Sequence, residues 1–543
     1  MLRSAVAPVR MRALPVDEAG RNALLRRVDW RFLLPDANPA ITVYSGRDRL
    51  LEAALAALTD RVVYLNLAPS GAADLAVLVD PDAHTLRAAS NSLRRGAACY
   101  VEWTSPLSGG PRAARRRLAD AGFVEATCYW SWPMPGRDAP RYWVPLDAGG
   151  AQANFLATRP TRPGVVSALR RRSLMSAWRI AFRTGAIAPV CAIAHKPSTN
   201  LPAAGWNGIN HDVARMLSGG WSRWGLGPPP RTLSWLLLTG GEASFNKVVG
   251  LVLADDERQP RVAVKLSRCP TSDTGLLREA HALELIAAER PALQGVPRVV
   301  FRERFGAALA LCQTVVRGRP LEQWLRRGNL RDLALAVTDW FCELAGRSRA
   351  SPAAEWRPRL VEPTLNGFAG LAGPAVVPEL VARTRRLFAS FDELPLTISH
   401  GDAGPSNVLM DECQRISVID WEDWEPRGLP VGDLSSLLTL LFFHLENPWH
   451  TGRFREVYRA TLDPTTNYGR VRAECFARYA SRVGVQPALV SPLSLVPWMQ
   501  RSLREHQGMR DATLGAEGRD AFSRGLYVTL WQEQLRTLEL GSC

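Results

Sequence analysis

The chain has 543 residues, of which 46% are hydrophobic and 22% are charged, with 42 Gly and 39 Pro. This usage excludes a wholly disordered chain, a collagen-like chain and a coiled-coil rod, and the length predicts two or more domains. The formal net charge of +15 is unevenly placed, because residues 1–230 hold 29 basic and 16 acidic side chains while residues 231–543 hold 38 and 36. Of the 67 basic residues three are lysines, namely Lys196, Lys247 and Lys265.

The start of the chain lacks a continuous apolar segment, and no run reaches the 18 or so apolar residues that would span a bilayer. Nine cysteines are scattered without a CxxC pair or a Cys/His ligand spacing. We therefore expect a cytoplasmic, soluble protein with reduced thiols and without a structural zinc site.

After an amino-terminal extension over residues 1–28, short apolar runs alternate with helix-like segments up to about residue 197. The apolar runs lie at 41–44, 61–65, 74–79 and 97–101, and the helix-like segments at 50–58 and 111–121. Strands that alternate with helices predict a mostly parallel, layered α/β sheet.

Residues 198–231 are rich in Gly, Pro and Trp, which indicates an interdomain linker. From Thr232 the pattern changes to several strands around a helix at 276–289. After Leu321 the chain is mainly helical, apart from the stretch 396–420. No internal repeat is evident.

The stretch 398–422 contains the types of side chain that phosphoryl transfer needs. Asp402 is followed five residues later by Asn407 and thirteen residues after that by Asp420. One carboxylate must lie beside the attacking hydroxyl, while an amide oxygen and a second carboxylate hold Mg²⁺ on the nucleotide phosphates. Gly401 and Gly404 would let the backbone form the loop between them.

This stretch resembles the aminoglycoside phosphotransferase/choline kinase family, which has the protein-kinase-like fold. The family's His-Gly-Asp-x-x-x-x-Asn loop and its later Asp-Trp-Glu are matched at residues 400–407 and 420–422. The resemblance implies an α+β bilobal domain with an N-lobe over 232–316 and a helical C-lobe over 317–543.

The resemblance also implies roles for single residues. Asp402 would be the catalytic base or would orient the acceptor hydroxyl, and Asn407 and Asp420 would bind Mg²⁺. His400 would support the loop, and Trp421 would stand where protein kinases have Phe.

Upstream residues fit the same family. Lys265 ends a Val-Ala-Val-Lys run of the kind whose lysine contacts the α- and β-phosphates of ATP. Arginine would not simply replace it, since a compact ammonium and a planar fork fit different geometry. Glu279, fourteen residues later on the next predicted helix, would be its ion-pair partner, and Glu284 is a weaker candidate.

The glycine-rich stretch before this strand has the place of the nucleotide-covering loop. Gly240, Gly241 and Ser244 would lay backbone N–H groups over the phosphates, whereas Lys247 is better explained as a solvated strand residue. Residues 312–321 resemble the family's hinge, where the backbone of Gln313 and Val315 would bind adenine.

The sequence says less about the molecule that accepts the phosphoryl group. Between Asp402 and Glu446 there are nine acids against Arg415 and Arg427. They would draw a cationic acceptor such as an amino sugar or a quaternary amine, or a few serve catalysis and the rest are solvated. The resemblance implies a small-molecule hydroxyl acceptor: an aminoglycoside, an amino sugar, a sugar or an amino alcohol.

Residues 29–197 resemble a class I S-adenosylmethionine (SAM)-dependent methyltransferase, through segments 29–35, 74–79, 93–102 and 118–124. The resemblance implies a Rossmann-like α/β domain. Where the family has a GxGxG turn after its first strand, this chain offers Gly46 alone, and the expected acid is not evident near residues 65–67. SAM is therefore an improbable cofactor, and we expect a methyltransferase-like scaffold.

Residues 151–200 hold seven Arg, one Lys and no acid. Three interpretations stay open: a nucleic-acid patch, a helix over about 170–182 that docks on a membrane surface or a protein, and a solvated insertion over 151–187. Aromatic residues are sparse there, so no nucleic acid is expected.

The main hypothesis is an ATP- and Mg²⁺-dependent O-phosphotransferase with a methyltransferase-like amino-terminal domain. One alternative is a bifunctional methyltransferase–kinase in natural-product or surface-glycan biosynthesis. The other is a scaffold that binds nucleotide without catalysis.

Overall fold

The computed structural model divides the chain into two compact units. Unit 1 is Met1–Leu277 with Val299–Val315, and unit 2 is Arg278–Arg298 with Val316–Cys543. The structure describes residues 18–105, 107, 109–133, 139–158, 176–178, 180–181, 189–198, 211–240, 247–347, 349–372, 378–506, 522 and 524–540.

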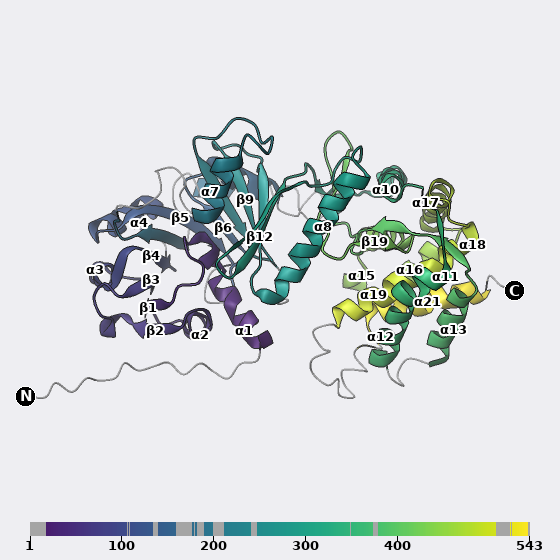
Figure 1. The fold of residues 1–543 in the computed structure, drawn as a ribbon, viewed down its shortest axis with the longest axis horizontal. Coiled ribbons are helices and arrows are strands. Elements are labelled where there is room, and N and C mark those ends of the chain that lie inside the picture. Colours follow the sequence, from purple (N-terminus) through teal and green to yellow (C-terminus); the bar gives the residue numbers. More distant parts are fainter. Residues whose placement is uncertain are drawn as a thin grey trace, which may run out of the picture. The chain divides into compact units, whose positions relative to one another are not determined.

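Unit 1 is built on one sheet of twelve strands among its described residues (Figure 1). The strand order is β11-β12-β10-β9-β8-β6-β5-β7-β4-β3-β1-β2. The strands are β1 Ile41–Ser45, β2 Arg61–Tyr64, β3 Ala73–Val79, β4 Leu93–Trp103, β5 Val124–Trp132, β6 Tyr142–Pro145, β7 Val190–His195, β8 Leu233–Leu238, β9 Val248–Ala254, β10 Val262–Leu266, β11 Val299–Phe305 and β12 Ala308–Thr314.

Helices of unit 1 connect these strands. They are α1 Glu18–Leu25, α2 Arg49–Leu58, α3 Ala83–Ser92, α4 Gly110–Asp120, α5 Gly149–Thr158 and α7 His211–Gly220, with the 3₁₀ turns η1 Arg26–Leu33, η2 Leu65–Leu67 and η3 Pro270–Ser272. Helix α8, Asp273–Glu289, runs from unit 1 into unit 2.

The amino-terminal end of the sheet is parallel, as the alternation of strands and helices predicts. Strands β2, β1, β3 and β4 are neighbours and pair in parallel, and β7 then inserts antiparallel between β4 and β5. Because both faces of such strands are covered, they are nearly continuously apolar. Along β3, for example, Leu75 and Val77 enter one core while Ala76 and Leu78 enter the other.

The two regions expected to form separate domains share this sheet. Strand β6 pairs antiparallel with β8, Tyr142 opposite Leu238 and Trp143 opposite Leu237. One hydrophobic core therefore runs from Trp30 to Cys312. Antiparallel pairing already begins with β7, β5 and β6, so the strands after Thr232 continue the antiparallel part of the same sheet and start no separate core.

The predicted linker over 198–231 is wrong in its described part. Residues 211–220 form α7, and Val213, Leu217 and Trp221 are buried in the same core. Their spacing of four residues places them on one helical face. Gly219 and Gly220 end this helix, and the run of Gly and Pro over 225–230 follows it.

The expected amino-terminal extension is also packed where it is described. Helix α1 leads into η1, and Leu25 and Val28 of the expected extension are buried in the core of unit 1. The basic block 151–200 is described over α5, β7 and short pieces around Trp178. Most of the helix predicted over 170–182 lies outside the described residues.

Unit 2 is mainly helical, as expected after Leu321. Its helices are α9 Leu321–Trp324, η4 Arg327–Asn329, α10 Leu330–Ala345, α11 Ala353–Trp356, the π-turn η5 Arg357–Val361, α12 Glu362–Ala372, α13 Pro378–Ala389, α14 Gly432–Glu446, α15 Pro448–Thr451, α16 Phe454–Leu462, α17 Asn467–Val483, α18 Pro487–Leu493, α19 Val496–Glu505 and α21 Leu526–Leu540. Short strands interrupt them, namely β13 Arg319–Pro320, β14 Ala350–Pro352, β15 Glu393–Pro395, β16 Thr397–Ser399, β17 Val408–Met410, β18 Ile416–Val418 and β19 Glu425–Gly428. None of the helices in the described part of the chain has the length and apolarity needed to cross a membrane.

Candidate active site

The loop between β16 and β17 is held by the imidazole of His400. Its Nδ1 accepts the backbone N–H of Asp402 at 3.2 Å, and its Nε2 donates to the carbonyl oxygen of Ile419 at 3.0 Å. The ring is fully buried and lies 4.7 Å from the ring of Trp421. His400 therefore ties the loop to the hairpin that follows it.

The hairpin β17–β18 brings the three predicted phosphoryl-transfer residues together. Val408 pairs with Val418, and the N–H of Ile419 donates to the carbonyl of Asn407 at 3.0 Å, so Asp420 follows directly beside Asn407. The Asn407 Nδ2 donates to the backbone carbonyl of Asp402 at 3.1 Å and to its Oδ2 at 3.3 Å. Asp420 has φ +74°, a conformation that costs about 1–3 kcal/mol and persists where the surroundings enforce it.

Asp433, at the start of α14, was not singled out by the sequence analysis. It is half-buried, and its carboxylate accepts the backbone N–H groups of His400 at 2.6 Å and Gly401 at 2.9 Å. Burial raises the pKa of Asp433, while nearby His400 and these two N–H bonds oppose the rise. Asp433 thus fixes the backbone of His400 and Gly401, the two residues that precede Asp402.

Arg501 on α19 is a second residue that the sequence analysis missed. Its Nη2 lies 2.9 Å from Oδ1 of Asp402 and donates to the carbonyl of Ala403 at 3.2 Å. The Arg501 side chain is 10% exposed and that of Asp402 is 40% exposed. With Asn407 on the other oxygen, the Asp402 carboxylate is held from both sides and stays open to solvent.

The two glycines of the loop are not equivalent. Gly401 has φ +81°, and a Cβ there would lie 2.1 Å from the carbonyl oxygen of Asp423. Gly404 has no positive φ, and a Cβ there would meet Leu440 at an ordinary 3.8 Å. The expectation that Gly404 is needed for the loop is therefore wrong, whereas Gly401 is required.

In unit 1, Lys265 lies on β10 between Val249 of β9 and Leu311 of β12, and it is 5% exposed. Gly240 follows β8 and is exposed, with open space around its Cα. Gly241 and Ser244 lie outside the described residues.

Glu279 is fully buried on the part of α8 that belongs to unit 2. Its pairing with Lys265 stays a prediction.

In the predicted hinge, the sheet already uses backbone groups of Gln313 and Val315. Gln313 lies inside the sheet, paired with Ala263 on one side and Val299 on the other. Val315 donates its N–H to the carbonyl of Arg261 at 3.3 Å, which leaves the Val315 carbonyl as the group it can offer to a base.

Most of the nine acids between residues 402 and 446 have partners within unit 2. The ion pairs are Asp402–Arg501, Asp411–Arg415, Glu412–Arg319, Asp423–Arg504, Glu425–Arg359 and Glu446–Arg327. Asp433 is occupied by backbone N–H groups. Five of these arginines come from outside the counted stretch, so the acidity of the stretch is largely neutralised.

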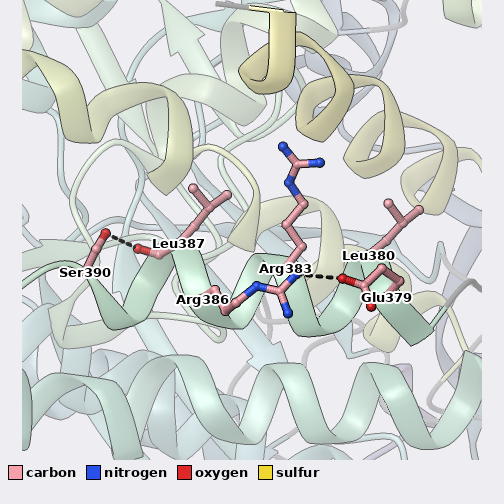
Figure 2. Close-up of a pocket in the computed structure, with 6 residues that line it drawn as sticks. All are labelled: Glu379, Leu380, Arg383, Arg386, Leu387 and Ser390. Atoms are coloured by element: carbon pink, nitrogen blue, oxygen red, sulfur yellow. Dashed lines mark hydrogen bonds and ion pairs between the residues drawn. The ribbon is translucent and has the colours of Figure 1, made fainter. Parts of the chain in front are cut away.

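Two other features of the described chain do not add to this site. A cavity of about 470 Å³ lies against α13 (Figure 2) and is lined by Glu379, Leu380, Arg383, Arg386, Leu387 and Ser390. None of them belongs to the predicted site. Among the described residues, no group of three or more His, Cys, Asp or Glu side chains is arranged to hold a metal ion.

The difference between Gly401 and Gly404 gives a matched pair of variants. We expect Gly401→Ala to lower the melting temperature by several degrees, since the left-handed backbone alone costs about 1–2 kcal/mol and the clash with Asp423 adds to it. Gly404→Ala should stay within about 0.5 kcal/mol of the parent. Thermal unfolding followed by circular dichroism measures both, and equal melting temperatures would contradict the role given to Gly401.

Several solved structures of aminoglycoside phosphotransferases are similar to this chain. An aminoglycoside-3'-phosphotransferase of type VIII is 21% identical, with a TM-score of 0.31, over 60% of this chain and 98% of that one. The enzyme APH(3'')-Id from Streptomyces rimosus is 15% identical, with a TM-score of 0.30, over 52% and 98%. A thermostable APH(4)-Ia mutant in a ternary complex with ADP and hygromycin B is 14% identical, with a TM-score of 0.34, over 57% and 96%.

The family assignment does not depend on these structures, whose TM-scores are all below 0.5. No curated protein sequence matches the chain. Residues 247–473 match the model of the phosphotransferase enzyme family, a range that includes Lys265, Asp402, Asn407 and Asp420. The carboxyl-terminal part of the chain therefore carries a domain of the phosphotransferase enzyme family.

Proposed function

We propose that the protein is an ATP- and Mg²⁺-dependent phosphotransferase that acts on a hydroxyl group of a small molecule. The observation that carries the proposal is the cluster formed by Asp402, Asn407 and Asp420 on one loop and hairpin. The position of these three residues inside the matched family range supports it.

Asp402 is the residue that serves the acceptor. Its carboxylate is oriented by Arg501 on Oδ1 and by Asn407 on Oδ2, and it remains 40% exposed, so a hydroxyl can reach it. In the reaction the hydroxyl oxygen forms a bond to the γ-phosphorus, the bond from that phosphorus to ADP breaks, and Asp402 accepts the hydroxyl proton.

Asn407 and Asp420 are suited to hold Mg²⁺, which prefers oxygen ligands. Both Asn407 amide bonds to Asp402 use Nδ2, so the amide oxygen Oδ1, which the Ser406 hydroxyl approaches at 3.5 Å, would be the ligand atom for a metal. When bound with ATP, Mg²⁺ neutralises charge on the phosphates. Lys265, a buried cation on β10, would contact the α- and β-phosphates.

The acceptor need not be cationic, because arginines already pair with most of the acids near the loop. We therefore retain the full range of hydroxyl acceptors: an aminoglycoside, an amino sugar, a sugar or an amino alcohol. Hygromycin B and streptomycin, bound in two of the similar solved structures, belong in a test panel beside neutral sugars.

We also propose that the amino-terminal α/β region does not use SAM. Doubly wound sheets bind ligands at the carboxyl ends of their parallel strands. There, Arg27 fills the space between Asp48 after β1 and Glu102 on β4, with Nη2 at 2.9 Å from Asp48 Oδ2 and 2.6 Å from Glu102 Oε2. Arg27 and Glu102 are each 1% exposed, so the chain's own side chains occupy this place.

Replacement of the proposed base tests the main proposal. Asp402→Asn should reduce phosphorylation of the true acceptor by about 10²–10⁴-fold, the usual contribution of a positioned general base. ATP affinity should be largely spared. Release of ADP across the acceptor panel and binding of a fluorescent ATP analogue measure the two quantities, and wild-type turnover in the variant would refute the role of Asp402.

Arg501 gives an independent test through its hold on Asp402. Arg501→Met should lower kcat by about 10–100-fold, since small misplacement of a reacting group has effects of that size. Arg504→Met is the matched control on the same helix, because Arg504 pairs with Asp423 instead. Steady-state kinetics measures both variants, and an equal loss of activity in the two would contradict the role given to Arg501.

Calorimetry tests the SAM proposal and the bifunctional alternative together. We expect no heat of binding when the full chain is titrated with SAM at millimolar concentration, because Arg27, Asp48 and Glu102 occupy the carboxyl ends of β1 and β4. A saturable heat would overturn this. Measured phosphorylation of any acceptor would exclude the non-catalytic scaffold.

A further inference from the structure

A buried cluster joins the amino-terminal segment to the strand that carries Lys265. Arg268 follows Lys265 by three residues, and its Nη2 and Nε contact Asp29 at 2.9 and 3.1 Å. Arg31 in turn donates to the carbonyl of Arg268 at 2.7 Å. Asp29 is 0% exposed, and Arg31 and Arg268 are each 3% exposed.

The same guanidinium reaches the residue at which the predicted nucleotide-covering loop begins. Arg268 Nη2 donates to the carbonyl of Thr239 at 3.3 Å. Thr239 donates its N–H to the carbonyl of Arg141 at 2.9 Å and its hydroxyl to the carbonyl of Pro140 at 2.8 Å. Its N–H, hydroxyl and carbonyl are thus all bonded to residues outside its own hairpin.

The sheet explains why Arg268 spans this distance. Strands β8 and β10 both pair antiparallel with β9, so they run parallel to each other and their carboxyl ends meet at one edge. Leu238 of β8 lies opposite Val249, and Leu266 of β10 lies opposite Val248. Arg268 bridges these two strand ends over the start of β9.

The energetics favour a positioning role over a purely stabilising one. A buried ion pair loses much of its attraction to desolvation, and apolar residues of similar size often stabilise a fold as well or better. Burial raises the pKa of Asp29, against the opposing effect of Arg268, and lowers the pKa of Arg31 to about 10. What such a cluster supplies is a fixed geometry.

We propose that Asp29 and Arg268 are positioning residues for nucleotide binding, and that they act through Thr239. Asp29 holds the Arg268 fork, the fork holds the Thr239 carbonyl, and Thr239 sets the direction in which the chain leaves β8 toward Gly240. The amino-terminal region is then a working part of the ATP site. This inference rests on the proposed function only in taking ATP as the nucleotide.

Direct nucleotide binding by the full chain tests the inference without a known acceptor. The probe is a fluorescent ATP analogue with Mg²⁺. We expect Asp29→Asn to raise its Kd by about 5–20-fold, because the amide cannot hold the charged fork of Arg268. Arg268→Lys, which keeps the charge and loses the fork, should raise the Kd similarly.

Glu102→Gln is the matched control. It weakens another buried ion pair of the same region, with Arg27, and Glu102 makes no bond to Thr239. Its melting temperature should fall about as much as that of Asp29→Asn, while its Kd stays within twofold of the parent. A purely structural role for Asp29 would move both variants alike.

Thr239→Val covers the case in which Asp29→Asn does not fold. It removes the hydroxyl bond to Pro140 while keeping the side-chain volume, and it should raise the Kd for the analogue. Thr239→Ser keeps the hydroxyl and should bind the analogue like the parent. An unchanged Kd in folded Asp29→Asn, or in Thr239→Val if that variant alone folds, would overturn the inference. Failure of the wild-type chain to bind the analogue would overturn the proposed function itself, and the inference with it.

Discussion

The short pairing of β6 with β8 is the constraint on which the rest of unit 1 depends. It joins the strands of the amino-terminal region, β1 to β7, to the antiparallel strands β8 to β12 that include Lys265, so that one core serves both. Because the strands share hydrogen bonds, the geometry of one region is transmitted to the other through backbone. The shared sheet also places Asp29 beside Arg268, which lies 239 positions further along the chain, and both are buried.

In unit 2 a few side chains fix the backbone of the proposed catalytic loop. A single half-buried carboxylate, Asp433, accepts two consecutive backbone N–H groups, and one imidazole, His400, bonds to both the loop and the hairpin. The exposed carboxylate of Asp402 is therefore carried by a backbone that has little freedom. Arg501 completes the arrangement from a helix that lies almost one hundred residues further along the chain.

The closeness of the proposed site residues could be predicted because they are local in the sequence. Asp402, Asn407 and Asp420 lie within one loop and hairpin, whose spacing is visible in the sequence. Arg501 and Asp29 could not be predicted, since their partners are set by tertiary packing and a lone Arg or Asp has no local signature. For the same reason, the count of acids between Asp402 and Glu446 was a poor guide to the local charge, because most of their arginine partners lie elsewhere in the chain.

For helix α7, the sequence contained a signal that was interpreted wrongly. Val213, Leu217 and Trp221 recur every four residues, which indicates a helix with one apolar face, but Gly and Pro nearby suggested a linker. The pairing of β6 with β8 has no such signature, because two short apolar strands do not reveal which edges meet.

The shared sheet limits how the chain can be divided. A fragment that began near residue 231 would retain every residue of the phosphotransferase motif, yet it would expose the edge of β8 and leave the Arg268 charge buried without Asp29. An unpaired apolar edge invites association with other chains. We therefore expect a working enzyme to need residues on the amino-terminal side of the family domain, including Asp29 of η1.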